Sequence, residues 1–144
     1  MIKQEQPVEI NILPDKVVFL IEKAKEFDAK DVVTETDLGS NAVDDNMIEV
    51  LENQRDDETL TEIFGFINLL NIDEQIDLVA LMWLGREDHA AEEDWPQLRA
   101  EAAAAHNRHS ARYLAGTPLL GDFLEAGLET LNYPVAELES AAFQ

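Results

Sequence analysis

The chain is most continuously apolar in the stretch IDEQIDLVALMWLGR, residues 72–86. Ile76, Val79 and Trp83 recur at the spacing of one helical face, which predicts a helix capped by Asp73 and ended by Gly85. Further apolar residues fill its other faces, namely Leu78, Leu81 and Met82. A helix that is apolar all round is central in its fold or buried between subunits. We therefore expect a core helix, with a homodimer through the region of Trp83 as an open alternative.

Other helices are predicted on both sides of this stretch. They are expected from Pro14 to about Ala29, over Met47–Leu51, after Asp56–Glu58, from about Asp94 to Leu114, after Gly116-Thr117-Pro118, and after Pro134. Gly116 suits the residue after a helix, Thr117 an N-cap and Pro118 the first helical turn. The pattern predicts an all-α fold, a compact array of about six helices.

The length of 144 residues fits a single helical domain over 1–144. Residues 1–13 are predicted to form an extended arm, because the one alternating run, at residues 8–12, has no partner strand. Residues 31–46 hold five acids, no base and a Gly-Ser-Asn turn signal, so they are predicted to be a flexible acidic loop.

The chain is strongly acidic, with 31 Asp and Glu against 10 Lys and Arg and a formal net charge of -21. Such a charge repels polyanions, so direct binding to nucleic acids or to an anionic membrane surface is not expected. The absence of cysteine excludes disulfides, thiolate catalysis and Cys-ligated zinc. No signal peptide and no membrane-spanning run is recognisable, which favours a cytoplasmic location.

Sequence signatures of catalysis are missing. There is no glycine-rich phosphate loop and no nucleophile elbow around the three serines, and the acidic run at Asp37 does not satisfy the EF-hand pattern. We therefore lean toward a protein without enzymatic activity and predict no catalytic residue and no cofactor.

One segment of the predicted Asp94–Leu114 helix is cationic. His106 and His109 are expected to share a helical face, with Arg108 and Arg112 on the face beside it. Guanidinium groups bind carboxylates and other anions in a bidentate manner, which indicates an anion site. The acid excess favours the competing interpretation, in which these arginines pair with the protein's own carboxylates.

The segment yields a set of candidate ligand-binding residues, which are Trp83, Arg86, His106, Arg108, His109, Arg112 and Tyr113. A metal site is a weaker alternative, in which His89 would join the two helical histidines. No metal-binding motif supports it, so no metal is predicted.

Two segments resemble a bacterial family of small acidic proteins. They are ALMWLGR at residues 80–86 and HxxRYLxGTPLLxxxLExGL from His109 to Leu128. The stretch from Pro14 to Asp28 is similar as well, so the resemblance covers most of the chain outside the acidic region 31–57. The family is largely proteobacterial and is a domain of unknown function. The resemblance implies an all-helical fold and no activity, cofactor or partner.

Three functions are open at this point. A protein–protein interaction module or small homodimer comes first, and a small-molecule, anion or metal-binding protein using the His106–Arg112 segment comes second. A nucleic-acid mimic ranks third, because the acids are spread evenly. Residues 1–62 hold 17 acids and 6 bases, a balance of -11, and the remainder holds 14 acids and 4 bases, a balance of -10.

Overall fold

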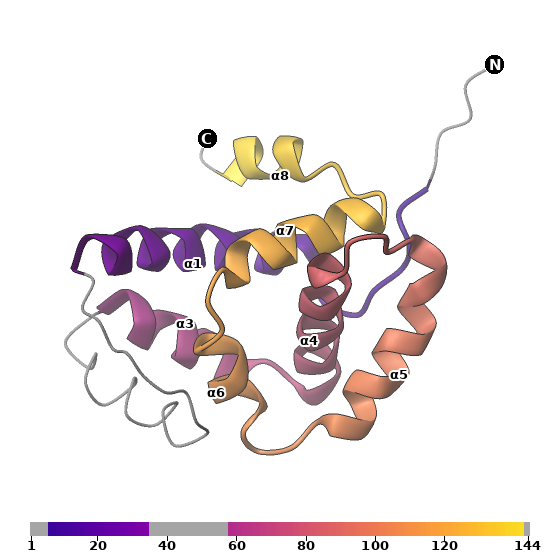
Figure 1. Cartoon of the computed structure of the whole chain (residues 1–144), viewed down its shortest axis with the longest axis horizontal. Coiled ribbons are helices and arrows are strands. Elements are labelled where there is room, and N and C mark those ends of the chain that lie inside the picture. The colour runs from indigo at the N-terminus through magenta and orange to yellow at the C-terminus, as the bar shows by residue number, and fades with distance from the viewer. Residues whose placement is uncertain (1–5, 35–57, 143–144) are drawn as a thin grey trace.

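The apolar helix that the sequence predicts to lie in the core does lie at the centre of the fold. A computed structural model describes residues 6–34 and 58–142. These residues form α1 (Pro14–Thr34), α3 (Glu58–Leu69), α4 (Ile72–Arg86), the 3₁₀ turn η1 (Glu92–Asp94), α5 (Trp95–Ala105), α6 (Ser110–Ala115), α7 (Leu120–Thr130) and α8 (Val135–Ala142). Within these two ranges there is no strand, and the predicted all-α fold is confirmed (Figure 1).

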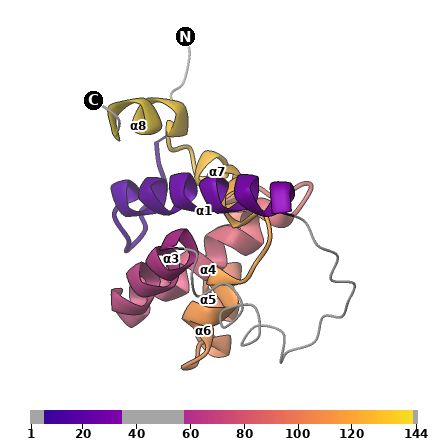
Figure 2. The same cartoon turned by 90° about the vertical axis from the view of Figure 1, so that its left-hand side faces the viewer.

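The other helices enclose α4. It packs against α5, α6 and α7, while α1 contacts α3, α7 and α8 and lies across the bundle (Figures 1 and 2). Four large side chains of α4 are completely buried, namely Leu78, Leu81, Met82 and Leu84. Since one chain covers this apolar helix by itself, its hydrophobicity no longer argues for a dimer, and the homodimer stays a prediction.

Two glycines allow α4 and α7 to touch backbone to backbone. A Cβ atom on Gly127 would lie 2.3 Å from the carbonyl oxygen of Leu81, and one on Gly85 would lie 1.9 Å from that of Phe123. Only glycine permits so close an approach. The prediction that Gly85 ends the helix is therefore wrong: α4 continues to Arg86, and the glycine is needed because α7 crosses there.

Two predicted helix starts are also wrong. Asn71, rather than Asp73, caps α4: its Oδ1 accepts from the Glu74 N–H at 2.8 Å, and Glu74 Oε1 accepts from the Asn71 N–H at 2.9 Å. This reciprocal capping box satisfies two free amides. Helix α7 begins at Leu120 rather than Pro118. The Thr117 hydroxyl bonds backward to the Tyr113 carbonyl at 2.7 Å, so it does not cap α7.

Helix α1 is longer than expected. It runs to Thr34, past the predicted end near Ala29, because residues 30–34 contain neither glycine nor proline. The start of the predicted acidic loop 31–46 is thus helical. The remainder of that loop and the helix predicted at Met47–Leu51 lie outside the described residues. No helix within 6–34 or 58–142 is long and apolar enough to cross a membrane.

The described residues of the N-terminal arm, 6–13, form neither helix nor strand, and hydrogen bonds attach them to the fold at two places. The Val8 N–H donates to the Leu131 carbonyl at 3.0 Å, and the Tyr133 hydroxyl donates to the Val8 carbonyl at 2.6 Å. Farther along, the N–H groups of Asn11 and Ile12 both donate to the Asp77 carboxylate of α4. The arm is therefore part of the fold.

Asp77 is completely buried, and its negative charge is balanced by α5. Arg99 Nε donates to Asp77 Oδ1 at 2.7 Å, and Arg99 also pairs with Asp73 at 3.3 Å. This contact raises the pKa of the Arg99 guanidinium, chiefly through the Asp77 hydrogen bond. A buried carboxylate is tolerated only when it is paired and hydrogen-bonded, so arm, α4 and α5 depend on one another here.

The α4–α7 crossing makes a prediction about glycine. Gly127→Ala is expected to lower the free energy of unfolding by at least about 2 kcal/mol, because the added methyl group overpacks a backbone contact. Gly65→Ala in α3 is the matched control, since a Cβ there meets nothing within 4 Å. It is expected to raise stability by about 0.5–1 kcal/mol through helix propensity. Urea unfolding measures both, and equal effects of the two changes would contradict this account of the crossing.

Candidate functional site

The helix predicted from Asp94 to Leu114 is in fact two helices. It starts as predicted, with a proline in the first turn of α5, but residues 106–109 separate α5 from α6. Asn107 stabilises the break: its Oδ1 accepts from the His109 N–H at 2.7 Å, and its own N–H donates to Ser110 Oγ at 3.1 Å. Asn and Ser side chains offer such bonds in competition with the helical ones. His106 and His109 therefore do not share a helical face.

His106 is a structural residue at the end of α5. Its Nε2 lies 2.9 Å from Oε1 of the buried Gln75 in α4. The Gln75 amide nitrogen donates to the Ile67 carbonyl at 2.9 Å, which leaves Oε1 as the atom facing the ring. Because that oxygen accepts, His106 Nε2 carries a proton and donates. This bond fixes the C-terminus of α5 to the first turns of α4.

The other two histidines are exposed and lie elsewhere. His89 follows the C-terminus of α4, and His109 precedes α6. Within the described part of the chain, no group of three His, Asp or Glu side chains is arranged to hold a metal ion. The weak metal hypothesis on His89, His106 and His109 thus gains no support from the geometry.

An aromatic pair joins α4 to α6 at the surface. Trp83 Nε1 donates to the Tyr113 hydroxyl at 2.9 Å, and both side chains remain partly accessible. Arg86 follows Trp83 by one turn of α4, and Arg112 precedes Tyr113 in α6. We call Trp83, Arg86, Arg112 and Tyr113 the Trp–Arg face. The structure thus brings two of the seven candidate residues, Trp83 and Tyr113, into direct contact, and Arg86 and Arg112 lie near them along α4 and α6.

The arginines divide into two classes. Arg99, which is not among the candidate ligand-binding residues, forms ion pairs with Asp77 and Asp73. Arg86, Arg108 and Arg112 form no ion pair with any carboxylate in residues 6–34 and 58–142. The interpretation that the acid excess favours, in which the arginines pair with the protein's own acids, therefore holds for Arg99, and among the described residues it has no support for the other three.

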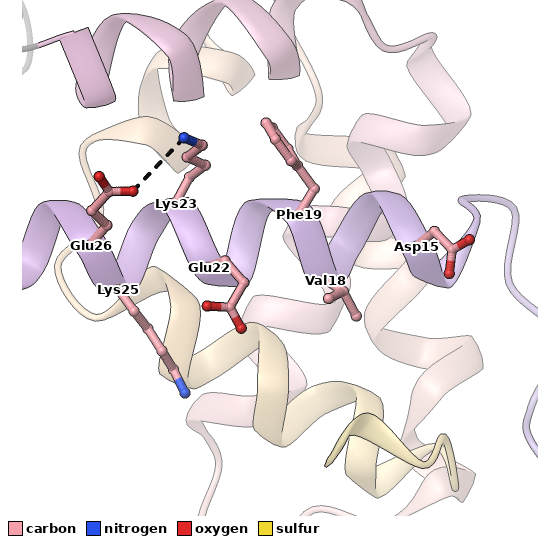
Figure 3. Close-up of a pocket in the computed structure, with 7 residues that line it drawn as sticks. All are labelled: Asp15, Val18, Phe19, Glu22, Lys23, Lys25 and Glu26. Carbon is pink, nitrogen blue, oxygen red and sulfur yellow. Dashed lines mark ion pairs between the residues drawn. The ribbon is translucent and has the colours of Figure 1, made fainter. Parts of the chain in front are cut away.

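A second candidate lies on α1, where a hollow of about 480 Å³ opens over the helix (Figure 3). Its described lining includes Asp15, Val18, Phe19, Glu22, Lys23, Lys25 and Glu26. Figure 3 shows Phe19 and Lys23 on one side of α1, and Val18, Glu22 and Lys25 on the other. Both lysines already pair with acids, Lys23 with Glu62 at 3.1 Å and Lys25 with Glu125 at 2.8 Å. Both lysines that line the hollow are therefore already engaged by acids of the protein.

The most important residue that sequence reasoning missed is Asp77. It interrupts an otherwise apolar run four residues after Asp73, and a single acid in such a run is a signal of a buried, paired carboxylate. Gln75, a polar residue in the same mostly apolar stretch, likewise indicates a buried side chain with a hydrogen-bond partner. The polar side-chain atoms of both residues are engaged by hydrogen bonds within the fold. Both position α5, and through it the Trp–Arg face.

Residues 60–133 match the family described as "Protein of unknown function (DUF3775)". This match covers just over half of the 144 residues. The chain belongs to this family. Searches of curated proteins and of solved structures found no match.

The region of the chain that matches the family holds the central helix α4 and the helices packed on it, α5, α6 and α7. It includes the Trp–Arg face, the Asp77–Arg99 pair and the Gly85–Gly127 crossing, while α1 and the arm lie outside it. Membership in a domain family of unknown function, expected from the ALMWLGR and His109–Leu128 segments, is confirmed. The largely proteobacterial range and the similarity over Pro14–Asp28 stay predictions.

The two neighbouring histidines predict different stabilities. His106→Ala is expected to lower the free energy of unfolding by about 1–3 kcal/mol, because the Gln75 oxygen loses its donor in a buried position. His109→Ala removes an exposed ring and is expected to change it by less than about 0.5 kcal/mol. Urea denaturation of both variants checks this, and a larger loss for His109→Ala would show that the roles are assigned the wrong way round.

Proposed function

We propose that this protein is a non-enzymatic interaction module whose Trp–Arg face binds a carboxylate-bearing segment of a partner protein. The observation that carries the proposal is the pairing state of the arginines. In a chain with a net charge of -21, Arg86 and Arg112 have no acidic partner among the described residues. Unpaired guanidinium groups in such an acidic chain are available to an external carboxylate.

The aromatic side chains supply the apolar part of this face. The Trp83 indole is held against Tyr113, so the partner would meet a rigid aromatic surface at little cost in side-chain entropy. Trp, Tyr and Arg are the residue types that dominate the energetic centres of protein interfaces. A carboxylate next to an aliphatic or aromatic side chain complements both parts of the surface.

The net charge limits the kind of partner. An extended polyanion is repelled by the surrounding acids, whereas a segment with one or two carboxylates gains the local contact with the arginines. Salt screens charges beyond about 8 Å at physiological ionic strength, so the short-range pairing is affected less than the long-range repulsion. The partner is therefore expected to be a mildly acidic segment with apolar residues.

Selection of a random displayed peptide library on the folded protein tests this proposal. Enriched peptides are expected to carry one or two Asp or Glu beside an aromatic or aliphatic residue. Titrated into the ¹⁵N-labelled protein, one such peptide is expected to shift the Trp83 indole and the amides of Arg112 and Tyr113. Arg112→Gln should weaken its binding about tenfold or more, because a charge-assisted contact is lost.

Lys23→Gln is the control, because it removes the same charge from α1 and should leave the affinity unchanged. The same peptide with its acids changed to Asn or Gln should not bind. Enrichment of peptides without acids, or shifts confined to other helices, would refute the proposal. Equal affinity of free succinate for the same residues would assign the face to small anions, the second function that the sequence left open, and would also refute the proposal.

A further inference from the structure

Three helices bring acidic side chains together at the C-terminal end of the fold. Glu139 of α8 lies against Glu125 of α7, and Lys25 of α1 pairs with Glu125 at 2.8 Å. The same lysine lies 3.9 Å from Asp122 of α7. Lys25 thus forms ion pairs with two carboxylates of α7, and no ion pair joins it to Glu139 among the described residues.

The Glu139 carboxyl is poorly solvated in this position. Its Oε2 is buried and has no hydrogen-bond partner. Helix α8 packs on α1 and α7, and the charged groups that face Glu139 from them are Glu22 and Lys25 of α1 and Glu125 of α7. Two of these three are acidic, so an ionised Glu139 would be repelled on balance.

We propose that α8 is a pH-sensitive flap, which is held on α1 and α7 while Glu139 is protonated and loosens when Glu139 ionises. A protonated Glu139 carboxyl gains a donor that it can give to Glu125, which would bridge α8 to α7. Loss of the proton removes that bond and leaves two adjacent carboxylates with a single lysine.

The electrostatic surroundings of Glu139 support this direction. Burial, and then the contact with Glu125, raise the pKa of Glu139 from its ordinary 4.5 to about 7. Burial is the largest single influence on Glu125 and acts to raise its pKa, but the contacts with Lys25 and Glu139 together outweigh burial and the pKa is lowered. When α8 is detached, Glu139 is in water and titrates at its ordinary value. Detachment therefore becomes easier as the pH rises toward 7, by up to about tenfold per pH unit, and levels off above 7.

The construction of α8 suits a movable element. It has 8 residues, and so short a helix is unstable alone in water. Val135 is its buried anchor, and Asn132, with φ of 74°, lies in the connection from α7. Glu22 and Lys25 project on the Val18 side of α1, so loosening of α8 would expose part of that side next to the hollow (Figure 3).

Paramagnetic relaxation tests the flap in the full chain. The protein has no cysteine, so a nitroxide on Ser140→Cys, at an exposed position of α8, is a single label. The titration runs from pH 5.5 to 8.5, above the pI of about 4.1. Broadening of α1 amides is expected to be strong at pH 5.5, to fall with a midpoint near 7, and to level off, while α3 and α4 amides stay constant.

Two variants make the test specific to Glu139. Glu139→Gln, which cannot ionise, should keep the broadening strong at every pH. Glu137→Gln, which removes an exposed charge from the same helix, should titrate like the parent protein. Broadening that does not change with pH in the parent, or that changes equally in Glu139→Gln, would overturn the proposal. So would a simultaneous change in α3 and α4, since that would mean global unfolding.

Discussion

The buried Asp77 carboxylate is the interaction on which the arrangement of the helices depends. It accepts hydrogen bonds from two backbone amides of the N-terminal arm and from Arg99 of α5, at a position with no exposure to solvent. A charge in that position is very costly without these partners. The arm, α4 and α5 are therefore held together by their hydrogen bonds to the Asp77 carboxylate, in addition to their apolar packing.

The placement of the Trp–Arg face follows from this attachment. Arg99 and His106 fix α5 to the first half of α4 at two points, and the Asn107 turn then redirects the chain into α6. Helix α6 is carried to the second half of α4, where Tyr113 meets Trp83. On another side of α4, the two glycines let α7 approach. The surface is thus exposed while residues 75–82 in the middle of α4 are buried.

The sequence predicted the elements better than their junctions. The apolar periodicity of α4 and α7 reports burial directly, and so their existence and core residues could be predicted. The break after Ala105 could not, because the run of alanines before it favours helix and the bonds of Asn107 depend on the turn once formed. Gly85 in the sequence favours a helix end, because the close approach of α7 that requires the glycine is a tertiary property. In the candidate site, the hydrogen bond between Trp83 and Tyr113 could not be predicted from the sequence. It joins α4 to α6, and the packing of these two helices depends on the helix break at residues 106–109.

A double-mutant cycle on Asp77 and Arg99, followed by urea unfolding, tests the central claim most directly. Asp77→Asn and Arg99→Gln keep the approximate size of the side chains and remove the charges. Each single change is expected to lower the free energy of unfolding by about 3 kcal/mol, since each leaves an unpaired buried charge or polar group. The double variant should lose clearly less than the sum, with a coupling of at least about 1 kcal/mol. Strict additivity, or single losses below about 0.5 kcal/mol, would contradict the role assigned to Asp77.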